Sequence, residues 1–168
     1  MRYSKVVLLG FMGAGKSSVA PVLAAQVGMQ WVDLDTVILK DSKFSSISEI
    51  FAAEGEEGFR EREAYAVRTV ASAKQLVIAT GGGVIGRAEN IELLKSNGGV
   101  CVFLQTSFDE IIRRLPNASG RPLLQDKERA EKLYHERQGL YLSCADITVK
   151  TDAKSVEQVS NEIAALVG

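Results

Sequence analysis

The sequence predicts an α/β fold in which one five-stranded parallel sheet lies between two layers of helices, a three-layer α/β/α domain. Short β-branched runs alternate with helical patterns from one end of the chain to the other, as in successive βα units. Several of these runs are continuously apolar, which is typical of strands buried on both faces. The length of 168 residues suits one such sheet and leaves no room for a separate second domain.

The elements can be placed in chain order from these patterns. The predicted strands are residues 5–9, 30–33, 76–79, 100–104 and 146–149. Apolar residues at helical spacing predict a helix over residues 17–27 and a closing helix with a stripe of Val156, Val159, Ile163 and Leu166. The segments SISE at 46–49 and SFDE at 107–110 fit capping boxes, so we expect helices to begin just after Ser46 and Ser107.

Two segments interrupt the simple alternation. Residues 34–73 are too many for one crossover helix and include Gly55 and Gly58, so this stretch is predicted to be an insertion with at least two helices, which we assign to substrate binding. Residues 115–126 concentrate Pro, Asn, Ser and Gly, which predicts a loop of the kind that often serves as a lid. We expect both segments to move within a single domain spanning residues 1–168.

Composition excludes several classes of protein. With 20 basic and 21 acidic residues the net charge is −1, which argues against a nucleic-acid binder or a protein held on an anionic membrane. Two distant cysteines, Cys101 and Cys144, and one histidine exclude a zinc cluster, and we expect both thiols to be reduced, buried and inert. No apolar run reaches the length of a membrane span. We therefore expect a cytoplasmic protein that meets anionic ligands through locally placed charge. We also expect it to be a monomer.

A phosphate-binding motif follows the first predicted strand. Residues 10–17 read GFMGAGKS, which matches GxxxxGK[ST] and opens the next helix. In such a P-loop the backbone N–H groups wrap the phosphate chain, Lys16 bridges the terminal phosphates, and the Ser17 hydroxyl can ligate Mg²⁺. The strand–loop–helix context makes a chance match the minor reading and predicts a P-loop NTPase-type sheet.

Two aspartates close the second predicted strand. Asp33 and Asp35 are two residues apart, so on a strand both carboxylates would point into the crevice at the carboxyl ends of the strands. Two like charges held this close need a cation or a polar substrate between them. The alternative is that one of them merely caps the following helix. We favour a functional role, because the P-loop already demands a metal ion near this edge.

Glycines and arginines supply the remaining candidates. The run from Glu54 to Glu63 is mostly a solvated helical face, and Arg60 could belong to it, although Arg60 follows Phe59 and a glycine break. The triplet Gly81-Gly82-Gly83 after the third strand permits close backbone approach to a ligand, while a tight turn alone would explain one or two of the three. The arginines in or beside the lid are Arg113, Arg114, Arg121 and, on the helix after it, Arg137.

These features, taken in order, resemble the shikimate kinase family over nearly the whole chain. The residues that carry the resemblance are the P-loop, Asp33-Leu34-Asp35, Gly55-Glu56 with Phe59-Arg60, Gly81-Gly82-Gly83, Arg121-Pro122-Leu123-Leu124, Arg137 with Tyr141, and Ala145-Asp146. Nucleoside monophosphate kinases and gluconate kinases share the P-loop and a lid but not this full set. The resemblance implies ATP-dependent phosphorylation of the 3-hydroxyl of shikimate, to give shikimate 3-phosphate and ADP on the route to aromatic amino acids.

The resemblance also implies roles for individual residues. Asp35 would hold and orient the attacking hydroxyl, and whether it also accepts the proton stays open. Arg60 and Arg137 would bind the substrate carboxylate beside Gly81, Gly82 and Gly83, with the Gly82 N–H offered to the substrate. Mg²⁺ would lie on Ser17 and Asp33. The nucleotide would contact Gly13, Ala14, Gly15, Lys16, Ser17, Ser18, Arg114 against the adenine, and Arg121 from the lid. Phe51 and Phe59 would wall the substrate pocket, with packing as their first role.

Two rival functions remain at this point. A gluconate or nucleotide kinase would share the P-loop, but Arg60 with Arg137 suits a carboxylate, which counts against a nucleotide acceptor although not by itself against gluconate. Their combination with Gly81-Gly82-Gly83 and Arg121-Pro122 favours shikimate. A nucleotide-binding regulatory module without catalysis should lack one of Lys16, Asp33, Asp35 or Arg121, and all four are present. The leading hypothesis is therefore a kinase with Lys16, Asp35 and Arg121 as its catalytic residues.

Overall fold

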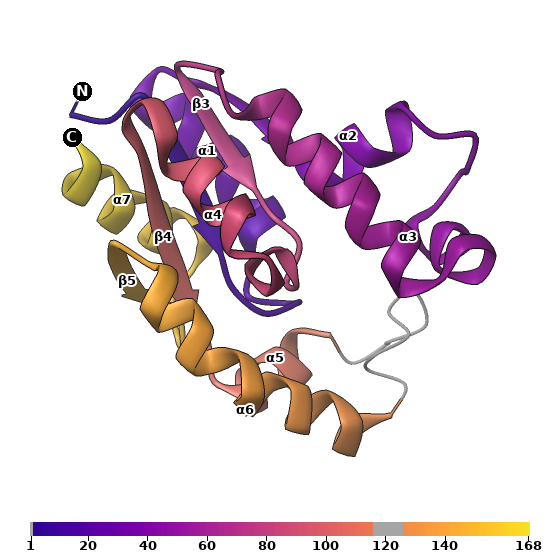
Figure 1. Cartoon of the computed structure of the whole chain (residues 1–168). Helices are drawn as coiled ribbons and strands as arrows, with labels where there is room; N and C mark the ends of the chain where they lie inside the picture. The colour runs from indigo at the N-terminus through magenta and orange to yellow at the C-terminus, as the bar shows by residue number, and fades with distance from the viewer. Residues whose placement is uncertain (1, 116–125) are drawn as a thin grey trace.

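The computed structural model describes residues 2–115 and 126–168 (Figure 1). Within them, five parallel strands form one sheet in the order β2-β3-β1-β4-β5. The strands are β1 (Lys5–Leu9), β2 (Gln30–Asp33), β3 (Leu76–Ala79), β4 (Gly99–Gln105) and β5 (Ile147–Lys150). The predicted fold class is confirmed, with β4 one residue longer at each end and β5 starting after Asp146. Asp146 precedes the strand because its carboxylate accepts a hydrogen bond from the Cys101 N–H at 2.8 Å.

Helices cover both faces of the sheet. The helices are α1 (Lys16–Val27), α2 (Leu34–Lys40), α3 (Ile47–Val70), α4 (Ala88–Lys95), α5 (Phe108–Arg114), α6 (Lys127–Cys144) and α7 (Val156–Val167), with short 3₁₀ turns η1 (Val84–Gly86) and η2 (Ser96–Gly98). On β1, Val6 and Leu8 pack against α1 and α7, whereas Val7 and Leu9 face the core formed with α2 to α6. This alternation is the period-two geometry of a strand buried on both faces.

The caps agree with the sequence in position but differ in detail. The hydroxyls of Ser46 and Ser107 each accept a hydrogen bond from the N–H three residues on, as predicted. In a capping box the glutamate would accept a hydrogen bond from the backbone N–H of the capping serine. Here the Glu49 carboxylate accepts from the Ser45 N–H, and the Glu110 carboxylate accepts from the Arg113 and Arg114 guanidinium groups. A reciprocal box forms instead at Ser155, ahead of α7.

The predicted insertion contains α2 and α3, which lie beyond one edge of the sheet (Figure 1). Helix α3 is broken at Gly55, whose φ of 70° and ψ of −175° are not helical. The positive φ is a conformation that glycine adopts without steric cost. The break lets the first turns of α3 take a direction of their own, as expected from the two glycines in this stretch.

Both cysteines are thiols. Cys101 on β4 is fully buried, and burial raises its pKa to about 12, so this thiol is unreactive. Cys144, at the end of α6, is only partly buried, so the expected burial holds for the first cysteine and not fully for the second. Among the described helices, none is long and apolar enough to cross a membrane.

Candidate functional site

One cleft of about 1750 Å³ opens at the carboxyl ends of the strands. Open parallel sheets bind their ligands at this edge. The predicted site residues that line the cleft are Gly13, Ala14, Gly15, Lys16, Ser17, Ser18, Asp33, Asp35, Arg60, Gly81, Gly82, Gly83, Arg114 and Arg137. Arg121 and nearly all of the predicted lid lie outside the described residues. Segments far apart in the chain therefore meet in a single cleft.

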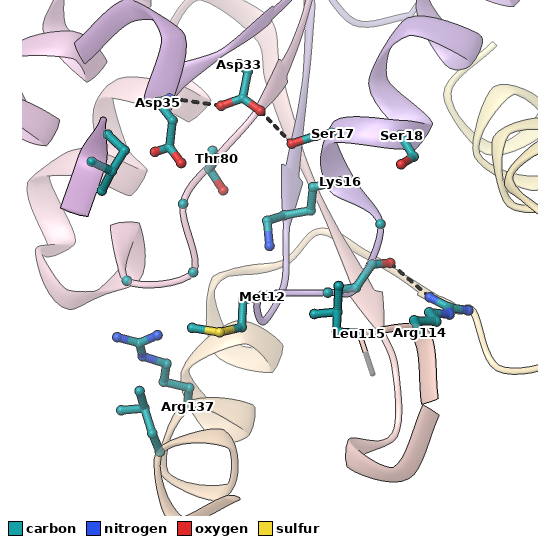
Figure 2. A pocket seen from close by; sticks show the side chains of 18 of the residues that line it. Met12, Lys16, Ser17, Ser18, Asp33, Asp35, Thr80, Arg114, Leu115 and Arg137 are labelled. Atoms are coloured by element: carbon teal, nitrogen blue, oxygen red, sulfur yellow. Dashed lines mark hydrogen bonds between the residues drawn. The ribbon is translucent and has the colours of Figure 1, made fainter. Parts of the chain in front are cut away.

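The P-loop occupies the floor of this cleft. Lys16 is 8% exposed, and its Nζ donates hydrogen bonds to the carbonyl oxygens of Gly10 and Phe11 at 2.5 and 2.9 Å. Figure 2 shows the ammonium pointing into the space between the two aspartates and Arg137. Gly15, at the N-cap of α1, has a φ of 98° and no side chain to cap the first turn. The N–H groups of that turn are the donors with which a helix N-terminus binds phosphate.

Asp33 connects the P-loop helix to the insertion (Figure 2). One of its carboxylate oxygens accepts the Ser17 hydroxyl at 2.5 Å, and the other accepts the Asp35 N–H at 2.9 Å. The first bond places a hydroxyl and a carboxylate side by side at the start of α1. Oxygen donors are what Mg²⁺ takes from a protein, usually one or two with waters and phosphates completing the shell. The donor set of Ser17 and Asp33 therefore fits the predicted ion.

The strand argument for the two aspartates was wrong in its geometry. Strand β2 ends at Asp33, which is the N-cap of α2, and Asp35 lies in the first turn of that helix. The Asp33 carboxylate satisfies an N–H that a helix terminus otherwise leaves without a partner, which is why the helix starts here. Both side chains nevertheless line the cleft, and Asp33 is also the helix cap that the alternative reading foresaw.

Two arginines converge on the glycine triplet beside Asp35. The Arg60 guanidinium lies so close to Gly83 that a Cβ there would fall 2.3 Å from Nη2. A Cβ on Gly82 would lie 3.3 Å from Arg137 Nη1 and 3.4 Å from the Tyr141 hydroxyl, which donates to the Gly82 carbonyl at 2.6 Å. A side chain at Gly83 would displace the Arg60 guanidinium, and one at Gly82 would press on Arg137 and Tyr141. The result is a compact cationic subsite next to a carboxylate.

Glu63 is a site residue that the sequence did not single out. It was assigned to a solvated face, yet it is 1% exposed and its carboxylate receives Arg60 Nη1 at 2.9 Å. Burial raises the pKa of Glu63, the Arg60 guanidinium opposes that rise, and the charge of Asp35 adds to it. A signal was available, because residues three apart share one face of a helix, so a cleft-facing Arg60 brings Glu63 with it.

Tyr141 is a second residue whose part was underestimated. It is fully buried, and burial raises the pKa of its phenol, while the Arg137 guanidinium opposes that rise. Its ring stacks on Phe103 of β4 with centroids 5.1 Å apart. Tyr141 therefore anchors α6 to the sheet and holds Gly82 close to Arg137.

Phe51 and Phe59 form a stacked wall on the insertion side of the cleft. Their ring centroids are 4.5 Å apart, and both rings line the cleft. Phe59 is 5% exposed and belongs to the core, as expected, whereas Phe51 is 37% exposed. Phe51 is thus held mainly by its partner ring.

Arg114 lies at the opposite end of the P-loop from Arg137 (Figure 2). Its guanidinium donates to the carbonyl oxygens of Thr151 at 2.9 Å and Ala14 at 3.3 Å, and to the Glu110 carboxylate at 3.0 Å. Hydrogen bonds from Arg113 and, to a smaller extent, from Arg114 lower the pKa of Glu110 to about 2, so the Glu110 carboxylate stays ionised. The Arg114 plane is thereby fixed between the P-loop and the turn before α7, as a stacking surface for a base would be.

Known proteins resemble this chain over nearly its whole length. A family model described as shikimate kinase matches residues 12–167. The shikimate kinases of Vibrio parahaemolyticus and Geobacter metallireducens are 42% and 43% identical over 161 residues, covering 94% of this chain and 92% and 88% of theirs. The solved structure of shikimate kinase from Acinetobacter baumannii in complex with shikimate has a TM-score of 0.91 and 35% identity, covering 98% of this chain and 93% of that one.

One solved structure shares the fold at low sequence identity. A gluconokinase from Sinorhizobium meliloti has a TM-score of 0.64 at 17% identity, covering 99% of this chain and 92% of that one, which is a likeness of fold alone. The shikimate kinases, by contrast, share 42% and 43% identity over 94% of this chain. The chain belongs to the shikimate kinase family, and it is a kinase of the transferase class.

Proposed function

We propose that this chain transfers the terminal phosphate of ATP to the 3-hydroxyl of shikimate, with the roles divided among the cleft residues as follows. The observation that carries this proposal is the placement of Arg60, Arg137 and Asp35 around one subsite, within reach of the P-loop. Two guanidinium groups suit a carboxylate, and the nearby aspartate suits the hydroxyl that attacks. Membership of the shikimate kinase family supports the choice of acid.

Phosphoryl transfer needs positioning and charge stabilisation more than covalent chemistry. Lys16 and the N–H groups at the start of α1 bind the phosphate chain, and Asp35 orients the substrate hydroxyl toward it. Ser17 and Asp33 would hold Mg²⁺, which when bound neutralises charge on the phosphates. Arg114 supports the base, and Arg121, from the segment outside the described residues, is assigned to the transferring phosphate. We further propose that the protein is a cytoplasmic monomer, and the two free thiols are in keeping with a reducing compartment.

A coupled assay of ADP release tests this function. Mg-ATP is supplied with shikimate, gluconate, AMP or CMP, and we expect turnover above the buffer rate with shikimate alone. Wild-type chain that releases ADP no faster with shikimate than with buffer would rule the proposal out. Stimulation by gluconate instead would mean that the protein is a kinase whose acid substrate is not shikimate.

Gly83→Ala should weaken shikimate binding without unfolding the protein. The new Cβ would displace the Arg60 guanidinium, which is the movable end of a side chain, and Gly83 has an ordinary φ of −96°. Misplacing a binding group by about 1 Å can cost up to about a hundredfold, so we expect the shikimate KM to rise about tenfold to a hundredfold. Steady-state kinetics and thermal unfolding measure the two effects.

Gly86→Ala is the matched control, because a Cβ at Gly86 meets nothing within 4 Å. It should leave both the shikimate KM and the melting temperature at wild-type values. If the two variants behave alike, Arg60 is not the carboxylate ligand that we propose.

A further inference from the structure

The first turns of α3 form an arm that carries one wall of the cleft. Residues 47–54 precede the break at Gly55, and Ile47, Ser48 and Phe51 on this arm line the cleft. At the break the chain folds back tightly, since a Cβ on Gly58 would fall 2.5 Å from the Glu54 Cβ. The arm therefore has no continuous helix behind it, and its direction depends on side-chain contacts, namely the packing of Ile50 in the core and the contacts across the break.

One ion pair joins the two sides of the break. The Arg62 guanidinium donates to both carboxylate oxygens of Glu54, through Nε and Nη2, at 2.7 Å each. The partners are eight residues apart, a spacing at which a straight helix does not bring side chains together. Arg62 also lies over the Phe44 ring, 5.7 Å from its centroid, on the strip of chain that leads into the arm. The same guanidinium thus binds Glu54 at the end of the arm and lies over Phe44, three residues before the arm begins.

The pair is separate from the chemistry of the cleft. Neither Glu54 nor Arg62 lines the cleft, and both side chains are 30% exposed. A simple surface pair contributes little to folding stability. A bidentate Arg–carboxylate pair differs from a simple pair, because its two parallel hydrogen bonds fix the relative orientation of the two groups as well as their distance. The hydrogen bonds from Arg62 also lower the pKa of Glu54, which keeps the pair charged.

We propose that Glu54 and Arg62 are positioning residues that clamp the arm, and with it the Phe51 wall, in the orientation that binds the acid substrate. Arg60 and Arg62 then have different roles on the same stretch of α3. Arg60 faces the cleft, and Arg62 holds the arm in place from outside the cleft. The inference rests on the proposed function, since it assigns the clamp to the shikimate subsite.

Steady-state kinetics of Arg62→Ala test the clamp. We expect the shikimate KM to rise by roughly threefold to tenfold, in line with the small free energies of partly exposed pairs. The kcat and the KM for ATP should stay within about twofold of wild type, because the P-loop and Asp35 are untouched. Arg62→Lys should repair the defect only in part, since an ammonium does not form two parallel bonds. Glu54→Arg combined with Arg62→Glu should recover most of the loss.

Arg87→Ala is the matched control. It breaks another ion pair that ends on α3, between Arg87 Nη2 and Glu61 Oε1 at 2.6 Å, which lies outside the break and is more exposed, with side chains 37% and 64% exposed. A KM for shikimate that rises no more in Arg62→Ala than in Arg87→Ala overturns the clamp, while wild-type turnover of shikimate keeps the proposed function.

Hydrogen exchange supplies a readout that does not depend on turnover. Without ligands, the amides of residues 47–54 should exchange faster in Arg62→Ala than in wild type or Arg87→Ala, because the arm opens more often. Unchanged exchange would overturn the clamp even if the chain proved to phosphorylate a different acid.

Discussion

Replacing Asp35 by asparagine should lower the kcat for shikimate phosphorylation by about 10²–10⁴-fold, the range that a positioned acid–base group contributes. ATP affinity should stay within about twofold of wild type, because Asp35 is not part of the P-loop. The change should also preserve the fold. The Asp35 N–H, not its side chain, makes the hydrogen bond to Asp33 that starts α2.

Asp41→Asn is the matched control for this variant. Asp41 lies just past the other end of α2, at its C-cap, and its side chain does not line the cleft. Turnover and equilibrium binding of an ATP analogue are measured for both variants. Loss of nucleotide affinity together with turnover in Asp35→Asn would mean that Asp35 belongs to the phosphate site and not to the acceptor hydroxyl.

The middle of the sheet was predictable from the sequence because β1, β3 and β4 are buried on both faces. Such strands read as continuous apolar runs, so β1 and β3 appeared with their observed bounds. The limits of β5 were harder, since its start depends on a bond between the Asp146 side chain and the Cys101 N–H, 45 residues away in sequence. Local patterns carry no record of such a contact.

The candidate site was predictable in its membership and less so in its geometry. The P-loop is a local motif, and its backbone form follows from its glycines. The aspartates were placed correctly in the cleft on an incorrect premise, because the strand ends at Asp33 and not at Asp35. Glu63 was missed because a charged residue in a charged run is usually solvated. Its burial depends on Arg60, which the sequence alone left undecided between cleft and surface.

Truncating either of the arginines proposed to bind the substrate should cost about 2–5 kcal/mol of binding to the acid if the contact is desolvated, which is about 30-fold to several thousandfold in kcat/KM. Arg60→Ala and Arg137→Ala should both raise the shikimate KM, because each removes one of the two guanidinium groups beside Asp35. Affinity for ATP should change little in either. Arg87→Ala, which removes an arginine that does not line the cleft, should have wild-type kinetics.

The two arginine variants should differ in stability. Arg60 is the partner of the buried Glu63, so Arg60→Ala leaves a carboxylate without its counter-charge and should lower the melting temperature. Arg137→Ala removes no such partner among the described ion pairs and should melt closer to wild type. Adding Glu63→Gln to Arg60→Ala should restore the melting temperature without restoring substrate binding, which separates the two roles of Arg60.

Acidity gives a further test of the Arg60 variant. Burial already raises the pKa of Glu63, and loss of Arg60 removes the largest opposing influence, so the folded-state pKa should rise further. A carboxyl whose pKa is raised by folding favours the native state at low pH and loses that advantage as the pH rises through the folded-state pKa. The melting deficit of Arg60→Ala relative to wild type should therefore shrink on acidification and grow toward alkaline pH. A melting deficit of Arg60→Ala that is independent of pH would mean that Glu63 is not the group left unpaired. For the second arginine, wild-type kinetics in Arg137→Ala would mean that Arg137 has a structural role and does not bind the substrate.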